Sequence, residues 1–341
     1  MTLLEEILDE IDREGPISFS RYMELALYHP LLGFYAGGGA GRRRDFITSP
    51  EVGPLFGSVV AIAIDRWWDE LGCPERFTFV EVGAGPGTLA RTVLRSDLRC
   101  ADALEYVTVE SSEAQRSEHP DGVDARHVMP ARVECGVIFA NELLDNLPFD
   151  ILSFVDGRGW REVKVGRSAD GLVEVLVETD RGPTPSGGAD SEIRMPIQTA
   201  AADWLASARS SLGTGRVVVI DYAVPSYPVD PGRDWLRTYG DHGRAGDALA
   251  GPGTKDITAD VDVGRLRAVA PTAAEGSQAT WLRRHRLDEL VAEGLEYWDA
   301  HRAAPDLRAM EMRSRATESE ALVDPRGLGA FTVLEWSVDR P

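Results

Sequence analysis

A strand that runs directly into a glycine-rich loop is the feature that most constrains the fold of this chain. Residues 77–82 read Phe-Thr-Phe-Val-Glu-Val, and glycines follow at positions 83, 85 and 87 before a helical segment expected over 87–98. Such a strand–loop–helix unit usually holds a nucleotide, because the glycines let the main chain approach the ligand closely. The pattern therefore predicts a nucleotide-type ligand above the end of this strand.

The segments that follow predict an α/β fold. Apolar strands are expected over 105–110, 124–128 and 136–141, with a helical stretch over 112–118 between the first two. This alternation is typical of a parallel sheet that is covered by helices on both faces. Later segments predict antiparallel strands after residue 148, helices over 197–212, 260–269 and 278–321, and a last strand over 330–338.

Three kinds of ligand compete for the glycine loop. Thr88 follows Gly87 without a lysine, which excludes a P-loop for ATP or GTP, and it also replaces the last glycine of a dinucleotide fingerprint. Glu81 would oppose a pyrophosphate, whereas it suits the ammonium and sulfonium of S-adenosylmethionine. Glu81, Gly83, Gly85 and Gly87 form the E-x-G-x-G-x-G pattern of class I methyltransferases, whose sheet is Rossmann-like and mostly parallel with an antiparallel last strand.

A second acidic residue supports the same cofactor. Glu110 ends the next expected strand, where a carboxylate can hold both ribose hydroxyls. The sequence therefore predicts S-adenosylmethionine bound by Glu81, the three glycines and Glu110. A nicotinamide cofactor, and a tight turn that binds nothing, stay open as alternatives.

Polar residues follow the fourth strand of the pattern, where this fold places its substrates. Asn141 and Glu142 stand at the strand end, and Asp145 comes one turn later. Glu142 could pair with a guanidinium group in bidentate fashion and accept the proton that methylation releases. These three residues are the predicted catalytic groups, although Asn141 and Asp145 could instead cap a following helix. Asp221 and Tyr222 end a later strand and could also line the pocket, or Tyr222 could belong to the core.

Charge and composition limit the kinds of partner that the protein is expected to bind. The net charge of −20 disfavours nucleic acid and anionic membranes as partners. Three widely spaced cysteines and six histidines form no metal-binding spacing, so no metal ligation is expected. The acidic, amphipathic N-terminus resembles neither a signal peptide nor a transit peptide, and no apolar run is long enough to span a membrane. A cytoplasmic location is expected.

Several separated motifs resemble the MidA family of class I methyltransferases. They include "YHPLLGFY", "DFITSPEVGPLFG", "VEVGAGPGTL" and "FANELLDNLPFD", with weaker matches toward the C-terminus. Mitochondrial members of this family methylate an arginine of a respiratory complex I subunit. The resemblance implies a protein substrate, such as a respiratory complex subunit. It also implies a cofactor lid that includes Asp45, Thr48, Ser49, Pro50 and Glu51, in which Glu51 could meet the methionine ammonium.

Some features qualify this resemblance. The residues around Ser49 could simply begin a helix, with Ser49 as N-cap and Pro50 at the first helical position. Asp260 stands where the family usually shows histidine, and Arg42, Arg43 and Arg44 read as a solvated loop. A small-molecule methyltransferase and an assembly factor without turnover remain alternative functions.

The expected organisation has four parts. Residues 1–75 form an N-terminal helical and lid region, and 76–150 form the cofactor-binding core. Residues 151–214 form an inserted antiparallel region with a helix, which would shape a groove for substrate. Residues 215–341 complete the core sheet and contain a helical insertion. The sequence does not predict the oligomeric state.

Overall fold

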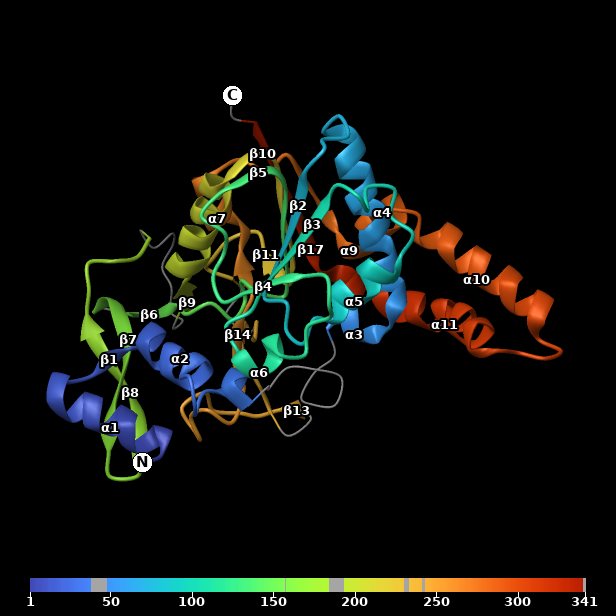
Figure 1. Ribbon diagram of the computed structural model, residues 1–341. Helices are drawn as coiled ribbons and strands as arrows, with labels where there is room; N and C mark the ends of the chain where they lie inside the picture. Colours follow the sequence, from blue (N-terminus) through green and yellow to red (C-terminus); the bar gives the residue numbers. More distant parts are fainter. Residues whose placement is uncertain (38–47, 157, 184–192, 230–232, 241–242, 340–341) are drawn as a thin grey trace.

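A seven-stranded sheet forms the centre of the protein in the computed structural model, which describes residues 1–37, 48–156, 158–183, 193–229, 233–240 and 243–339 (Figure 1). Its strand order is β16-β17-β10-β5-β2-β3-β4. The strands are β2 (Phe77–Val82), β3 (Leu104–Val109), β4 (Asp124–Arg126), β5 (Val133–Asn141), β10 (Leu212–Asp221), β16 (Ala274–Ser277) and β17 (Thr332–Asp339). The five strands from β10 to β4 are parallel, and β17 runs antiparallel to β10. The predicted Rossmann-like sheet with an antiparallel last strand is confirmed.

The central strands are apolar on both faces because helices cover each side. On β2, Phe77 and Phe79 pack with α4 (Pro54–Glu70), α5 (Thr88–Arg95) and α9 (Gln278–Arg284). Val80 and Val82 point to the opposite face and pack with α7 (Thr199–Ser211) and α8 (Val263–Val269). Successive side chains of a strand alternate between faces, so burial on both sides produces the continuous apolar run seen in the sequence.

A second sheet lies beside the N-terminal helices (Figure 1). It contains β1 (Ile17–Ser18), β6 (Asp150–Val155), β7 (Gly159–Ser168), β8 (Gly171–Glu178) and β9 (Ile193–Ile197). It shares a core with α1 (Leu3–Glu14), α2 (Phe19–Tyr28) and the short helix η1 (Phe34–Gly37). Smaller pairings join β12 (Leu236–Gly240) to β13 (Gly243–Arg244) and β14 (Asp256–Ala259), and β11 (Ala223–Val224) to β15 (Val261–Asp262).

The helical region expected over 278–321 consists of three helices. After α9, the chain forms α10 (Leu287–His301) and α11 (Leu307–Leu322), which extend away from the sheet as a pair (Figure 1). Arg286 adopts a left-handed conformation with φ 68° between α9 and α10, where it is the N-cap of α10. Pro305 precedes α11 and disfavours helix at the residue before it. The remaining short helices are α3 (Ser49–Val52), α6 (Glu113–Arg116) and η2 (Leu328–Ala330).

Candidate active site

A cavity of about 420 Å³ opens at the carboxyl ends of β2, β3 and β5. The structure brings together nine of the predicted site residues in its lining, which are Thr48, Pro50, Glu51, Glu81, Gly83, Gly85, Glu110, Asn141 and Glu142. Gly87, Ser49 and Asp145 do not line it. Asp45 and the arginines at 42–44 lie outside the described residues.

The glycine loop is held entirely by hydrogen bonds within the protein. The N–H groups of Gly83 and Ala84 donate to the Val109 carbonyl, and that of Gly87 donates to Ala84. The Gly85 N–H donates to Glu110 Oε2 at 2.9 Å. Each N–H of the loop therefore has a protein partner, in contrast to a phosphate cradle, where these groups point at the ligand.

Gly85 leaves space that a side chain would fill. Its φ is +53°, and a Cβ built there would meet only Gln115 Oε1, at 3.9 Å. Because Gly85 also lines the cavity, the main chain is open to a ligand at this point. A ligand can rest directly on the backbone of the loop.

Glu81 is buried at the end of β2 beside the loop. Its Oε2 accepts a hydrogen bond from the Tyr106 hydroxyl at 2.7 Å. Burial raises the pKa of Glu81 to about 8, and the charge of Glu110 acts in the same direction. A cationic ligand would reverse this effect by favouring the carboxylate.

Glu110 follows β3, and three hydrogen-bond donors of the protein hold its carboxylate in place. Its Oε1 accepts from the Ser112 N–H at 2.8 Å and from the Ser111 hydroxyl at 3.2 Å, while Oε2 holds Gly85. These bonds fix the carboxylate at the rim of the loop, where ribose hydroxyls would be expected to lie.

Glu142 is held in an uncommon backbone conformation at the end of β5. Its φ is 53°, in the left-handed region that non-glycine residues rarely adopt. Its Oε1 accepts from the Ser49 N–H at 3.1 Å and from Asn141 Nδ2 at 2.9 Å. Burial raises the pKa of Glu142 to about 8, and the nearby charges of Asp145 and Glu51 add to the shift. The result is a carboxyl group poised to pair with a cation or accept a proton.

The segment before α4 connects Glu142 to distant parts of the chain. Ser49 donates its hydroxyl to Gln278 Oε1 at 3.0 Å, and Gln278 in turn donates to the Leu322 carbonyl. Thr48, not Ser49, is the N-cap of α3, and it makes no capping hydrogen bond through its side chain. The alternative that Ser49 is the N-cap is therefore wrong: its N–H and hydroxyl bind Glu142 and Gln278 instead.

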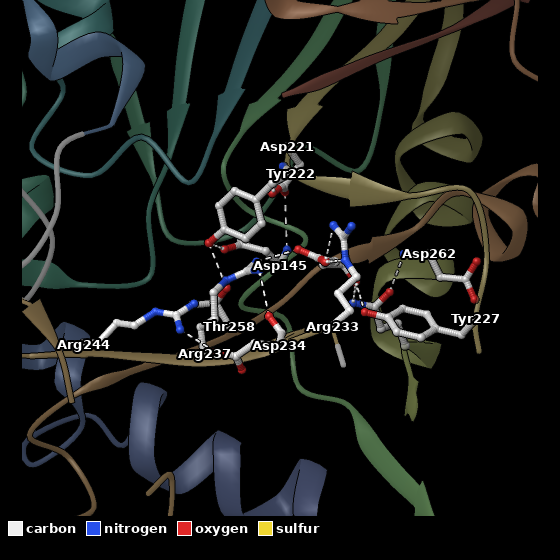
Figure 2. Close-up of polar contacts among 12 residues, drawn as sticks. Asp145, Asp221, Tyr222, Tyr227, Arg233, Asp234, Arg237, Arg244, Thr258 and Asp262 are labelled. Atoms are coloured by element: carbon white, nitrogen blue, oxygen red, sulfur yellow. Dashed lines mark hydrogen bonds and ion pairs between the residues drawn. The ribbon is translucent and has the colours of Figure 1, made fainter. Parts of the chain in front are cut away.

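Asp145 points away from the cavity, which corrects its assignment as a group that touches substrate. It is fully buried, and its carboxylate accepts a hydrogen bond from Tyr222, whose hydroxyl also lies 2.8 Å from Thr258 Oγ1 (Figure 2). Burial raises the pKa of Asp145 to about 6. Asp221 and Tyr222 also lie outside the lining. Asp145 and Tyr222 thus act as a support behind the residues that follow β5.

The helix that Asn141 and Asp145 were alternatively expected to cap does not form. Residues 144–146 make a turn, and the Leu144 and Asp145 N–H groups donate to Asp221 Oδ2 at 2.9 and 3.3 Å. The Asp221 carboxylate therefore accepts hydrogen bonds from two main-chain N–H groups in the segment where the helix was expected.

Asp260 belongs to an ion-pair cluster next to this support. Its two carboxylate oxygens lie 2.6 Å from Arg237 and 2.7 Å from Arg233. The Arg237 guanidinium also stacks 4.6 Å from the centre of the Tyr222 ring. Asp260 thus fixes two arginines that pack behind the site, and it does not line the cavity.

Sequence reasoning missed the residues that complete the cavity wall. Tyr28 and Tyr35 line it, with ring centres 5.4 Å apart, and their hydroxyls donate to the Asn146 carbonyl and to Asp256 Oδ1. Trp204 and Gln115 also contribute. No local pattern marks these side chains as ligand-facing, although both tyrosines fall within the "YHPLLGFY" motif.

The electrostatics of the lining favour a cationic ligand. Four carboxyl groups line the cavity, from Glu51, Glu81, Glu110 and Glu142, and no lysine or arginine is among the described lining residues. A sulfonium, ammonium or guanidinium would favour the ionised form of these groups and be attracted to it, whereas a pyrophosphate would find no cationic partner among the described lining residues.

Comparisons with known proteins agree with this chemistry. A sequence profile of the family described as "Putative S-adenosyl-L-methionine-dependent methyltransferase" matches residues 59–281. The chain is 30% identical to bovine "Protein arginine methyltransferase NDUFAF7, mitochondrial", covering 84% of this chain and 74% of that protein. It is 28% identical to the Drosophila melanogaster homologue, covering 86% and 78%.

Solved structures show the same fold. A Burkholderia thailandensis protein bound to S-adenosyl-homocysteine superposes with a TM-score of 0.83 at 25% identity, covering 98% of this chain and 91% of that one. A native structure of an uncharacterised protein from the same organism gives a TM-score of 0.80 at 28% identity, over the same shares of the two chains.

The comparisons overturn the expected cytoplasmic location. The bovine, Drosophila and human relatives are all named mitochondrial proteins. The expectation rested on the character of the N-terminus, which is weak evidence for a cellular compartment. Separately, none of the helices in the described part of the chain is long and apolar enough to cross a membrane.

Proposed function

Because the chain belongs to the family of S-adenosyl-L-methionine-dependent methyltransferases, we propose that it transfers the methyl group to a nitrogen of a protein side chain, with arginine as the favoured acceptor. The family establishes an enzyme that uses S-adenosylmethionine. The names of the bovine and Drosophila relatives, which are protein arginine methyltransferases, support the acceptor. The family resemblance extends the proposal to an arginine of a respiratory complex subunit.

The acidic cavity is the observation that carries this proposal. Its four carboxyl groups, with no lysine or arginine among the described lining residues, match a cofactor and an acceptor that both bear positive charge. The glycine loop supports the same conclusion, since its N–H groups are bound within the protein and Gly85 offers bare main chain.

We assign the cofactor to the loop side of the cavity. Glu81 faces the methionine ammonium, Glu110 holds the ribose, and Gly83 and Gly85 support the ligand through their main chain. Gly87 lies outside the lining and begins the turn into α5 with φ 76°. Thr48, Pro50 and Glu51 close the site from α3, while Ser49 contributes by holding Glu142.

Glu142 and Asn141 are assigned to the acceptor. The cofactor supplies a methyl group activated on sulfonium sulfur, and the residues of the chain orient the acceptor nitrogen toward it. An ionised Glu142 holds the guanidinium and concentrates its positive charge on the nitrogens that are not methylated. As the N–C bond forms and the S–C bond breaks, the acceptor nitrogen becomes acidic and its proton passes to Glu142. A carboxyl group whose pKa burial has raised is a better base for this step.

Radiolabelled S-adenosylmethionine and matched peptides test this function. Peptides that contain one arginine should become labelled, and the same peptides with lysine or citrulline in that position should not. The Glu142→Gln variant should bind the cofactor and fail to label the arginine peptides. Labelling of small metabolites in preference to peptides would refute the protein acceptor, and equal labelling of lysine peptides would refute arginine.

A further inference from the structure

His119 lies against the underside of the glycine loop, outside the motifs that identify the site. Its Nε2 is 2.8 Å from the Gly85 carbonyl oxygen, and its Nδ1 is 2.9 Å from Thr108 Oγ1 on β3. A Cβ built on Gly87 would stand 3.0 Å from His119 Cδ2. The imidazole therefore bonds to Gly85 and lies close beside Gly87, while Thr108 anchors it to the central sheet.

The hydrogen bonds of the ring determine its tautomer. A carbonyl oxygen only accepts, so Nε2 must carry the hydrogen that it donates to Gly85. In the neutral ring Nδ1 then accepts from the Thr108 hydroxyl, which is fully buried. Both nitrogens are thus engaged, and rotation of the ring would break both contacts.

The same segment is tied to the loop a second time. Arg91 on α5 donates to the carbonyls of Pro86 and Glu118, each at 2.6 Å. Consecutive carbonyls of the loop, those of Gly85 and Pro86, are therefore held by His119 and Arg91. A shift of the loop would break the hydrogen bonds that the charged Arg91 and the His119 ring donate to it.

The peptide groups of Gly85 connect this clamp to the ligand. Its N–H binds Glu110 Oε2 and its C=O binds His119, so the residue is held from both sides. We propose that His119 is a positioning residue for S-adenosylmethionine, which fixes the main-chain surface at Gly85 and the carboxylate of Glu110 on which the cofactor rests. The proposal depends on the cofactor assignment alone and not on the identity of the acceptor.

Calorimetric titration with S-adenosylmethionine tests this role without any acceptor. Loss of one such hydrogen bond corresponds to a change of roughly 2- to 10-fold in affinity, so His119→Ala should weaken binding by about that factor. His119→Gln should restore part of the affinity, since its amide can still donate to Gly85. His301→Ala is the matched control, because His301 is exposed and contacts Tyr297 of its own helix, through a hydrogen bond to the carbonyl and through ring stacking. It should bind as wild type does.

The outcomes separate this inference from the cofactor assignment. If a folded His119→Ala protein binds S-adenosylmethionine as tightly as the wild type, the inference about His119 is overturned and the cofactor assignment stands. A wild type that does not bind S-adenosylmethionine overturns the cofactor assignment and the inference with it. Should His119→Ala fail to fold, nitrogen-15 NMR of the wild-type imidazole decides: the Nε2–H tautomer supports the clamp, and a neutral ring protonated on Nδ1 overturns it.

Discussion

Replacing Gly85 with alanine should weaken cofactor binding in addition to lowering stability. The residue adopts φ +53°, which costs a residue with a Cβ roughly 1–2 kcal/mol of folding free energy. In the free protein the new methyl group would meet only Gln115 Oε1, at 3.9 Å, so the folded state has room for it. With cofactor present the same methyl group enters occupied space, and overpacking of this kind costs about 1–3 kcal/mol. We therefore expect affinity to fall by roughly 5- to 150-fold, and further for Gly85→Val.

Calorimetric titration and urea unfolding measure the two effects separately. Gly72→Ala is the matched control, because Gly72 also has a positive φ of +82° and a Cβ there would meet nothing within 4 Å. Gly72→Ala should lose a similar amount of stability and bind S-adenosylmethionine as the wild type does. The reasoning is refuted if Gly85→Ala binds normally, or if both variants lose affinity to the same extent.

The buried polar groups give four further predictions. Glu142→Gln should reduce the methyl-transfer rate at least 100-fold with unchanged cofactor affinity, because the amide keeps the Ser49 contact and loses the base; a rate near that of wild type contradicts this role. Burial raises the pKa values of Glu81 and Glu142 to about 8. Between pH 5 and pH 8 the folded state therefore keeps protons on these groups that the unfolded chain loses. Their contribution to the free energy of unfolding should fall as the pH rises through this range. The cationic cofactor favours the ionised form of Glu81, so titrations at pH 7 in buffers of different ionisation enthalpy should show proton release; its absence argues against contact with Glu81. Tyr222→Phe should lower the free energy of unfolding by about 1–3 kcal/mol, since it removes the donor to Asp145, while cofactor affinity stays unchanged because Tyr222 is outside the lining.

The cofactor-binding half of the site could be predicted because its signals are local. The order of apolar strand, glycines and helix over residues 77–95 specifies one strand–loop–helix unit, and Glu81 belongs to the same short stretch. Alternation of further strands and helices then predicts a parallel sheet, and the carboxyl ends of parallel strands meet at one edge. Glu110 and Glu142 could therefore be placed near the loop without knowledge of any side-chain contact.

The acceptor half and the supports of the site depend on contacts between distant segments. Ser49 reaches Glu142 across 93 positions, and His119 reaches Gly85 across 34. Asp145 looked equivalent to Glu142 in the sequence, yet the turn after β5 directs it toward Tyr222, which is 77 positions away. No local pattern specifies which way such a side chain points.

The sequence by itself determined the sheet, the glycine loop and the acidic character of the cofactor site, because hydrophobic periodicity and backbone freedom act over a few neighbouring residues. Only the tertiary structure decided that Tyr28 and Tyr35 complete the cavity, that Asp145 lies behind it, and that His119 clamps the loop. These outcomes depend on how helices and loops pack over the strand ends. The arrangement there is selected because it buries the apolar side chains of the whole fold and gives its buried polar groups hydrogen-bond partners.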